Sequence, residues 1–287
     1  SEPLVQAFTQ CLATEAPPLA RVDVIEPEVI PPDHSRKGFA ILPSAEGAIA
    51  TAIGPDVGVC PACRAELFDP HDRRWRYPFI NCTNCGPRFT IIQDIPYDRP
   101  FTTMAGFKLC PDCEREYKDP TNRRFHAQPV ACPVCGPKVW LEVQNDEGGM
   151  LNDEAIVETQ RLLAEGKIVA IKGLGGFHLM TDARNDAAIQ RLRQRKHREE
   201  KPFAVMYPTL AMLQQDCEVS DLEQRLLLSP ESPIVLLIRK TANPQSAIRN
   251  SQSIAPGNPY LGAMLPYTPL HQLLMNELGF PVIATSG

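Results

Sequence analysis

Two patterns in this 287-residue sequence predict a multidomain protein of the α+β and α/β classes. Eight of the ten cysteines stand in four C-x-x-C pairs, which is typical of small modules built around a bound ion. After about residue 150, segments with helical apolar spacing alternate with short apolar runs, as in helices packed on a twisted sheet. The predicted fold is therefore a tandem pair of four-cysteine modules followed by an α/β domain.

Residues 1–43 are expected to form a helix from Glu2 to about Ala13, a strand near Arg21–Glu26 and a short strand at Gly38–Leu42. These elements are too few for an independent domain, so we interpret them as the end of a small α/β domain that begins upstream. Residues 44–58 are rich in Gly and Ala and are expected to be a linker.

Residues 59–141 contain the cysteine pairs as a duplicated unit. Within each half 18 residues separate the pairs, and the sequence from Val59 matches that from Leu109 at an offset of 50. Two such pairs provide the four thiolates of a closed structural zinc site. The predicted Zn²⁺ ligands are Cys60, Cys63, Cys82, Cys85, Cys110, Cys113, Cys132 and Cys135. Each repeat is expected to bind its own ion; an interleaved arrangement, in which the first and fourth pairs share one ion, is the alternative.

Other uses of these cysteines fit the sequence less well. Disulfides need an oxidising compartment, and no signal peptide is visible. A redox C-x-x-C normally occurs once, and a catalytic zinc keeps one position free of protein ligands. The isolated Cys11 and Cys217 are expected to be small buried hydrophobic residues.

Composition and charge argue against two classes of partner. No run approaches the ~20 apolar residues that cross a bilayer, so no membrane partner is expected. The net charge of −5 gives no global attraction to nucleic acid. DNA reading by the cysteine modules is not expected, because no helix with base-contact spacing follows them.

Residues 150–287 are expected to form the α/β domain. The predicted helices are Asp153–Glu165, Asp186–His197 and Pro269–Leu278. The predicted strands are Lys167–Lys172, Phe177–Thr181, Pro202–Met206, Ile234–Ile238, Leu261–Leu265 and Pro281–Thr285. Because the chain stops where a loop and further structure would follow the last strand, we expect this domain to be truncated at its C-terminus.

Three segments of the α/β domain have residues suited to binding phosphate. The glycines of Lys172–Leu179 would let a ligand approach the backbone, although a bulge between two strands explains them equally well. Arg191–Pro202 has six cations in twelve residues, which would clamp a triphosphate or, alternatively, form a solvated helix face. The hydroxyls and amides of Thr285-Ser286-Gly287 would bind a phosphate or acyl oxygen.

Together these motifs resemble a known family. A strand with a Gly loop, K-x-R-x-x-K-P from Lys196 to Pro202, SPIVLLI, LPYTPLH and the terminal ATSG are similar to the YrdC/Sua5-type domain. With the duplicated cysteine array in front, nearly the whole chain resembles the central part of the HypF-type carbamoyltransferases of nickel–iron hydrogenase maturation. The resemblance implies that residues 1–43 are the end of an acylphosphatase-like domain.

The resemblance also implies an ATP-dependent activity in the cytoplasm. Members of this family use carbamoyl phosphate, ATP and Mg²⁺ to form carbamoyl adenylate, and pass the carbamoyl group to the C-terminal cysteine of a HypE-type partner on the way to the cyanide ligands. The nucleotide and the adenylate are then expected on Lys172, Gly173, Gly175, Lys196, Arg198, Lys201, Thr285 and Ser286. No catalytic residue is assigned.

The sequence departs from related threonylcarbamoyl-adenylate synthases in its substrate contacts. Gly173 and Gly175 stand where those enzymes have threonines, and Met264 replaces an arginine, consistent with a substrate that lacks the threonine carboxylate. The acylphosphatase signature and the family's H-x-x-x-H are absent, so the chain is expected to bind nucleotide and form or hold the adenylate without completing transfer. His178 and His271 are expected to be packed structural histidines.

Two other functions stay open. One is a threonylcarbamoyl-adenylate synthase for tRNA modification, although the zinc array and Met264 argue against it. The other is a zinc-built scaffold with weak RNA binding, because the cations of Arg191–Lys201 would bind the phosphates of RNA or of ATP alike.

Overall fold

The computed structural model describes residues 2–31, 53–143, 149–240, 246, 248 and 251–287. They belong to two compact units, Ser1–Ala52 and Ile53–Gly287. The predicted strand Gly38–Leu42 and most of the predicted linker lie outside the described residues. No helix in the described ranges is both long and apolar enough to span a membrane.

The described part of the first unit has one helix, α1 (Glu2–Thr14), close to the predicted bounds. The predicted strand Arg21–Glu26 is wrong, since this segment has no regular structure. Its alternating apolar pattern suits a strand, but no described segment of this unit pairs with it, and a strand needs a partner for its backbone hydrogen bonds. The prediction that Cys11 is buried is also wrong, because α1 exposes that side chain.

In the second unit each cysteine module begins with a short helix that the sequence reading missed. These helices are α2 (Pro61–Phe68) and α3 (Pro111–Lys118), and each begins directly after the first cysteine of its module. Proline suits the first helical turn because its φ is preset and its missing N–H would be unpaired there anyway. Two 3₁₀ turns, η1 (Arg99–Phe101) and η2 (Thr103–Gly106), lie between the modules.

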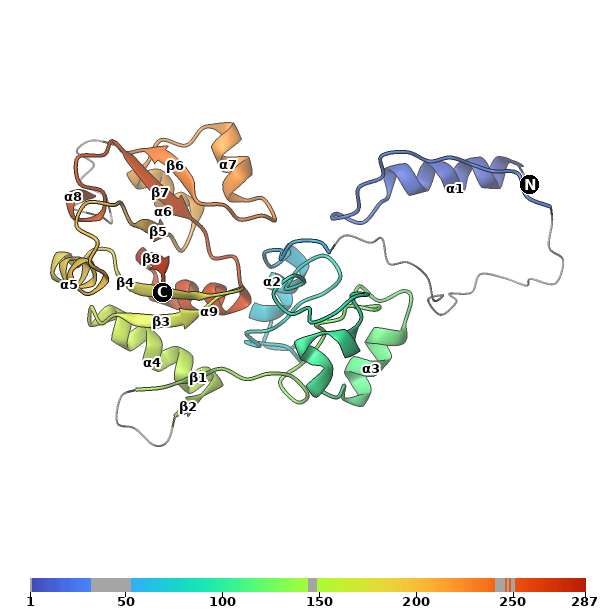
Figure 1. Ribbon diagram of the computed structural model, residues 1–287, viewed down its shortest axis with the longest axis horizontal. Coiled ribbons are helices and arrows are strands. Elements are labelled where there is room, and N and C mark those ends of the chain that lie inside the picture. Colours follow the sequence, from blue (N-terminus) through green and yellow to red (C-terminus); the bar gives the residue numbers. More distant parts are fainter. Residues whose placement is uncertain (1, 32–52, 144–148, 241–245, 247, 249–250) are drawn as a thin grey trace. The chain divides into compact units, whose positions relative to one another are not determined.

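A two-stranded hairpin, β1 (Trp140–Leu141) and β2 (Met150–Leu151), leads into a six-stranded mixed sheet of order β3-β4-β8-β5-β7-β6 (Figure 1). The pair β5–β7 is parallel, and the other neighbours are antiparallel. All six strands lie where the sequence predicts them, with ends shifted by at most two residues: β3 (Val169–Lys172), β4 (Phe177–Asp182), β5 (Ala204–Met206), β6 (Val235–Ile238), β7 (Tyr260–Met264) and β8 (Val282–Ser286).

The three long predicted helices are present as α4 (Asn152–Ala164), α5 (Asp186–Lys196) and α9 (Pro269–Leu278). Three shorter helices were not predicted: α6 (Leu210–Asp216), α7 (Asp221–Leu227) and α8 (Ser251–Ile254). A signal for α7 was available, because Ser220 and Glu223 form a capping box, which has a recognisable spacing.

The sheet separates two hydrophobic cores. One contains Ile189 of α5 with Phe203 and Ile283, and Cys217 is fully buried in it as predicted. The other contains Leu273 of α9 together with buried residues of the first cysteine module, among them Leu67 and Ile80. The first module therefore shares a hydrophobic core with the sheet domain and is not an independently packed domain.

Candidate functional site

Each cysteine module brings its own four cysteines together. The ligand atoms of each group lie within 4.8 Å of one another, and the groups are Cys60, Cys63, Cys82 and Cys85, then Cys110, Cys113, Cys132 and Cys135. This is the sequential arrangement, with one cluster in each repeat. The interleaved alternative, in which the first and fourth pairs share an ion, is wrong.

The sulfur–sulfur distances fit a tetrahedral zinc ion. In the first cluster Sγ of Cys82 lies 3.7 Å from that of Cys60 and 3.9 Å from that of Cys85, which is 3.5 Å from Sγ of Cys63. A zinc ion about 2.3 Å from four thiolates holds them about 3.8 Å apart, whereas a disulfide needs about 2.05 Å. The two clusters therefore fit two structural zinc ions, each closed by four thiolates.

Arginines of each module hydrogen-bond to a cysteine of the other module. Arg73 and Arg74 donate to Sγ of Cys113 at 3.3 and 3.4 Å. Arg123, the equivalent of Arg73 in the second repeat, donates to Sγ of Cys63 at 2.9 Å. A zinc ion with four thiolates has a net charge of about −2, so these donors stabilise the charge of the neighbouring centre.

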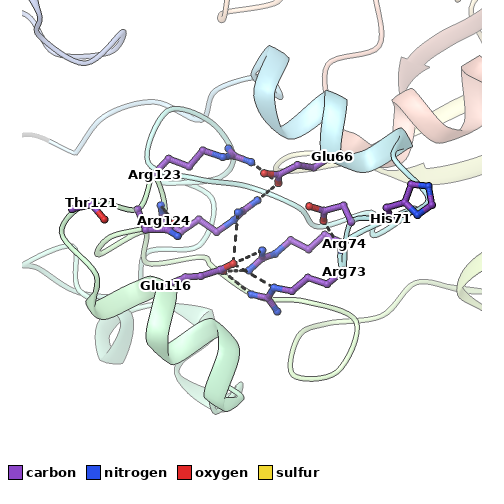
Figure 2. A pocket seen from close by; sticks show the side chains of 10 residues that line it. Glu66, His71, Arg73, Arg74, Glu116, Thr121, Arg123 and Arg124 are labelled. Atoms are coloured by element: carbon purple, nitrogen blue, oxygen red, sulfur yellow. Dashed lines mark hydrogen bonds and ion pairs between the residues drawn. The ribbon is translucent and has the colours of Figure 1, made fainter.

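Two glutamates complete this network (Figure 2). Glu116 accepts from Arg73 at 2.6 Å and from Arg74 at 2.5 Å, and Glu66 pairs with Arg123 at 2.5 Å and with Arg124. Burial raises the pKa of Glu116, but the hydrogen bonds from Arg74 and Arg73 outweigh it and lower the pKa to about 2. We call these four arginines and two glutamates the inter-module network.

A groove of about 650 Å³ lies between the modules, and the inter-module network lines much of it (Figure 2). Its arginines are already bonded to glutamates and thiolates of this chain. The cationic charge of the groove is therefore neutralised from within, and we assign the network a structural role, which is to hold the two zinc modules together.

Four of the residues predicted to bind nucleotide meet at one end of the sheet. Lys196, at the end of α5, donates its ammonium to the carbonyl of Ser286, the last residue of β8. Nη1 of Arg198 donates to Oγ1 of Thr285 at 3.0 Å, and the guanidinium carbon lies 4.9 Å from the centre of the Phe203 ring. The end of α5 and the end of β8 thus form one cationic corner.

The Gly-rich loop joins β3 to β4 beside that corner. Nζ of Lys172 donates to the carbonyl of Gly175 at 3.2 Å, and Gly175 has φ of +80°, which favours glycine. The Gly173 amide donates across the loop to the Gly176 carbonyl at 2.8 Å. Lys201 is exposed, and its carbonyl accepts from Nε of Arg198 at 3.2 Å.

Not every cation of Arg191–Lys201 is available for a phosphate. Arg193 is 5% exposed and lies against the Phe203 ring, with its guanidinium bonded to backbone carbonyls that include that of Arg198. Arg191 donates to the carbonyl of Gly166. At least one of the six cations is thus unable to bind a phosphate. Arg193 lies four residues after Ile189 on α5, so both side chains are on the buried face of the helix.

Fold and site together define a class of protein: two four-thiolate zinc modules joined to a YrdC-like α/β domain. A family model described as "HypF finger" matches residues 59–92 and 109–142, and the Sua5–YciO–YrdC model, described as "Telomere recombination", matches residues 161–287. The same two regions carry the zinc clusters and the six-stranded sheet.

Similar proteins identify the family. The carbamoyltransferase HypF of Synechocystis is 51% identical over 288 residues, which cover 100% of this chain and 36% of that protein. HypF2 of Cupriavidus necator is 55% identical over 269 residues, covering 93% and 33%. The crystal structure of a full-length HypF in its phosphate- and nucleotide-bound form is 47% identical, with a TM-score of 0.85, covering 99% of this chain and 36% of that one. The chain belongs to the HypF carbamoyltransferase family and spans about a third of the length of these relatives.

Proposed function

We propose that the YrdC-like part of this chain binds ATP and forms or holds carbamoyl adenylate, as one step of carbamoyl transfer in nickel–iron hydrogenase maturation. The observation that carries the proposal is the cationic corner, where Lys196 and Arg198 meet Thr285 and Ser286 beside the Gly loop. Full-length relatives bear the name carbamoyltransferase, and one of them was crystallised with nucleotide and phosphate.

Adenylation requires that negative charge on the phosphate oxygens be stabilised. In adenylation a carboxylate oxygen of carbamate attacks the α-phosphorus of ATP, and pyrophosphate leaves with the bonding electron pair. Charge on the phosphate oxygens is stabilised by positioned cations and N–H donors. Lys196 would supply a compact positive charge. Arg198 would supply a planar guanidinium with several N–H donors, which its contact with the Phe203 ring holds in place. Mg²⁺ bound with the nucleotide would offset charge on the β- and γ-phosphates.

The first zinc module would brace this site. The Val59 amide donates to the carbonyl of Tyr267 at 2.8 Å, and the Gly58 amide donates to that of Pro230 at 2.9 Å. A Cβ on Gly175 would lie 3.4 Å from the Thr90 methyl group, so the module also reaches the Gly loop. Loss of zinc is therefore expected to loosen the loop as well as the module.

The donor and acceptor of the carbamoyl group are inferred from the family. The donor would be carbamoyl phosphate, and the acceptor the C-terminal cysteine of a HypE-type partner. We place the protein in the cytoplasm, because reduced thiolates are kept in that compartment. Both transfer and partner docking would involve parts of the longer relatives that this chain does not span.

Calorimetry with ATP on the zinc-loaded chain tests the proposal. Arg198→Ala is expected to weaken binding at least ~10-fold, or about 1.4 kcal/mol, because it removes a charged phosphate contact. Arg225→Ala is the control, since it removes an exposed arginine of α7, outside the cationic segment Arg191–Pro202. Equal ATP affinity in the wild type and Arg198→Ala would refute this placement of the phosphates. Salt-dependent RNA binding without nucleotide binding would favour the scaffold function instead.

A further inference from the structure

A cluster of three aromatic side chains lies beside the Gly loop. His178 of β4 and His271 of α9 stack with ring centroids 5.4 Å apart and an interplanar angle of 6°. The Tyr267 ring lies 5.0 Å from that of His271. Gly173 of the loop lies against the cluster, because a Cβ at this position would be 3.1 Å from Oη of Tyr267 and 3.5 Å from Cε1 of His271.

The histidines present buried polar atoms without partners. His271 is 0% exposed, and no described residue hydrogen-bonds to either of its ring nitrogens. Nδ1 of His178 is likewise buried and unpaired among the residues that the structure describes. Buried polar groups in folded proteins are almost always hydrogen-bonded, so three unpaired nitrogens in one cluster need partners that the described residues do not provide.

The histidine pair adjoins the proposed phosphate site. His178 lies directly opposite Ser286 in the β4–β8 register, and the carbonyl of that serine accepts from Lys196. Thr285, which Arg198 contacts, is the next residue of β8 and faces the other side of the sheet. Ser286 therefore lies between the two sites, because its carbonyl accepts from Lys196 and its strand pairs with the strand of His178.

The chemistry of the pair selects among acyl groups. Burial and the neighbouring His178 lower the pKa of His271 to about 3, and burial also lowers the pKa of His178, so both rings are neutral near pH 7. A neutral imidazole presents one N–H donor and one acceptor nitrogen. A carbamoyl group matches this, because its NH₂ donates and its carbonyl accepts, whereas a carboxylate only accepts and a methyl group does neither.

We propose that His178 and His271, with Tyr267 beside them, recognise the carbamoyl end of the adenylate and select its NH₂ group over a methyl group of the same size. This inference rests on the function proposed above and deepens it, since it names the residues that distinguish the substrate. It also explains why a glycine stands at position 173, where any side chain would meet the cluster.

Two stable adenylate analogues test the inference by calorimetry on the zinc-loaded chain. They are 5′-O-(N-carbamoylsulfamoyl)adenosine and 5′-O-(N-acetylsulfamoyl)adenosine, which differ by NH₂ against CH₃, and AMP reports the nucleotide site alone. The wild type is expected to bind the carbamoyl analogue at least ~10-fold more tightly, since the acetyl group leaves buried nitrogens unpaired. His271→Phe and His178→Phe are expected to reduce this preference below ~3-fold with AMP affinity unchanged.

The controls separate this inference from the proposed function. His71→Phe, a histidine of the groove between the zinc modules, is expected to keep the full preference. His178 is only partly buried, so its variant remains informative if His271→Phe does not fold, which zinc content and circular dichroism would reveal. Equal wild-type affinity for the two analogues, or a preference that persists in both histidine variants, overturns the inference while AMP binding leaves the proposed function standing. If AMP, ATP and both analogues fail to bind, the proposed function fails and this inference fails with it.

Discussion

Arg74 offers the sharpest test of how the two zinc modules are held together. Its side chain is 1% exposed and makes three kinds of contact with the other module. Nε donates to the Ala131 carbonyl at 2.8 Å, and Nη2 donates to Oε2 of Glu116 at 2.5 Å and to Sγ of Cys113 at 3.4 Å. Changing Arg74 to Met keeps the aliphatic stem and removes every one of these donors.

The expected cost follows from those contacts. A buried carbonyl left unpaired costs about 1–3 kcal/mol. Removing one partner of a buried ion pair costs about 3–5 kcal/mol. The two penalties overlap, and Arg73 keeps its bond to Glu116, so we expect Arg74→Met to lower the free energy of unfolding by about 3–5 kcal/mol in total.

Urea unfolding with excess zinc measures this loss. The matched control is Arg115→Met, which breaks the pair with Asp112 between side chains that are 72% and 56% exposed. Exposed pairs contribute about 0–1 kcal/mol, so the control is expected to change little. A chelator assay is expected to show faster release of one zinc ion from Arg74→Met, because Cys113 loses a charged donor. A stability loss no larger than that of the control would refute the view that the inter-module network holds the modules together.

Three further changes test the metal sites, the packing and the histidine pair. Cys85→Ser is expected to reduce the zinc content from two ions to one, whereas the control Cys11→Ser, at an exposed cysteine, is expected to keep two. Atomic absorption measures the zinc content, and an equal content in the two variants would contradict the four-cysteine clusters. Gly136→Ala would place a Cβ 2.0 Å from Oη of Tyr77, so we expect a loss of about 1–3 kcal/mol, and an unchanged melting temperature would speak against this packing. Because His271 has a folded pKa of about 3 against about 6.5 unfolded, the unfolded chain binds the proton first as pH falls. Stability should therefore fall by about 1.4 kcal/mol per unit between pH 6.5 and 4.5, and His271→Phe should lack this part of the slope; parallel curves for the two proteins would contradict it.

Local patterns in the sequence were enough to predict the zinc sites and most of the sheet. A C-x-x-C pair places two thiolates on one turn, and a second pair 18 residues later is close enough along the chain to complete a tetrahedron. Which pairs share an ion was decided by the structure, which excludes the interleaved arrangement. The strands and long helices follow from the period with which apolar residues recur, which is also local. The segment Arg21–Glu26 shows the limit of that reasoning, since its pattern suits a strand but its described surroundings provide no partner.

Tertiary structure alone decided which side chains meet. The arginines of the zinc modules bond to cysteines and glutamates 39 to 60 positions away, in the other repeat, and no spacing along the chain indicates these contacts. Arg193 is one of the six cations predicted to clamp a triphosphate or to form a solvated helix face. In the fold it is buried, and its guanidinium bonds to the loop after α5. His178 and His271 stack only because α9 packs against the face of β4 that carries His178. Ligand spacing and apolar period are properties of neighbouring residues and can be read along the chain, whereas hydrogen bonds and ring stacking across the fold depend on how whole elements pack.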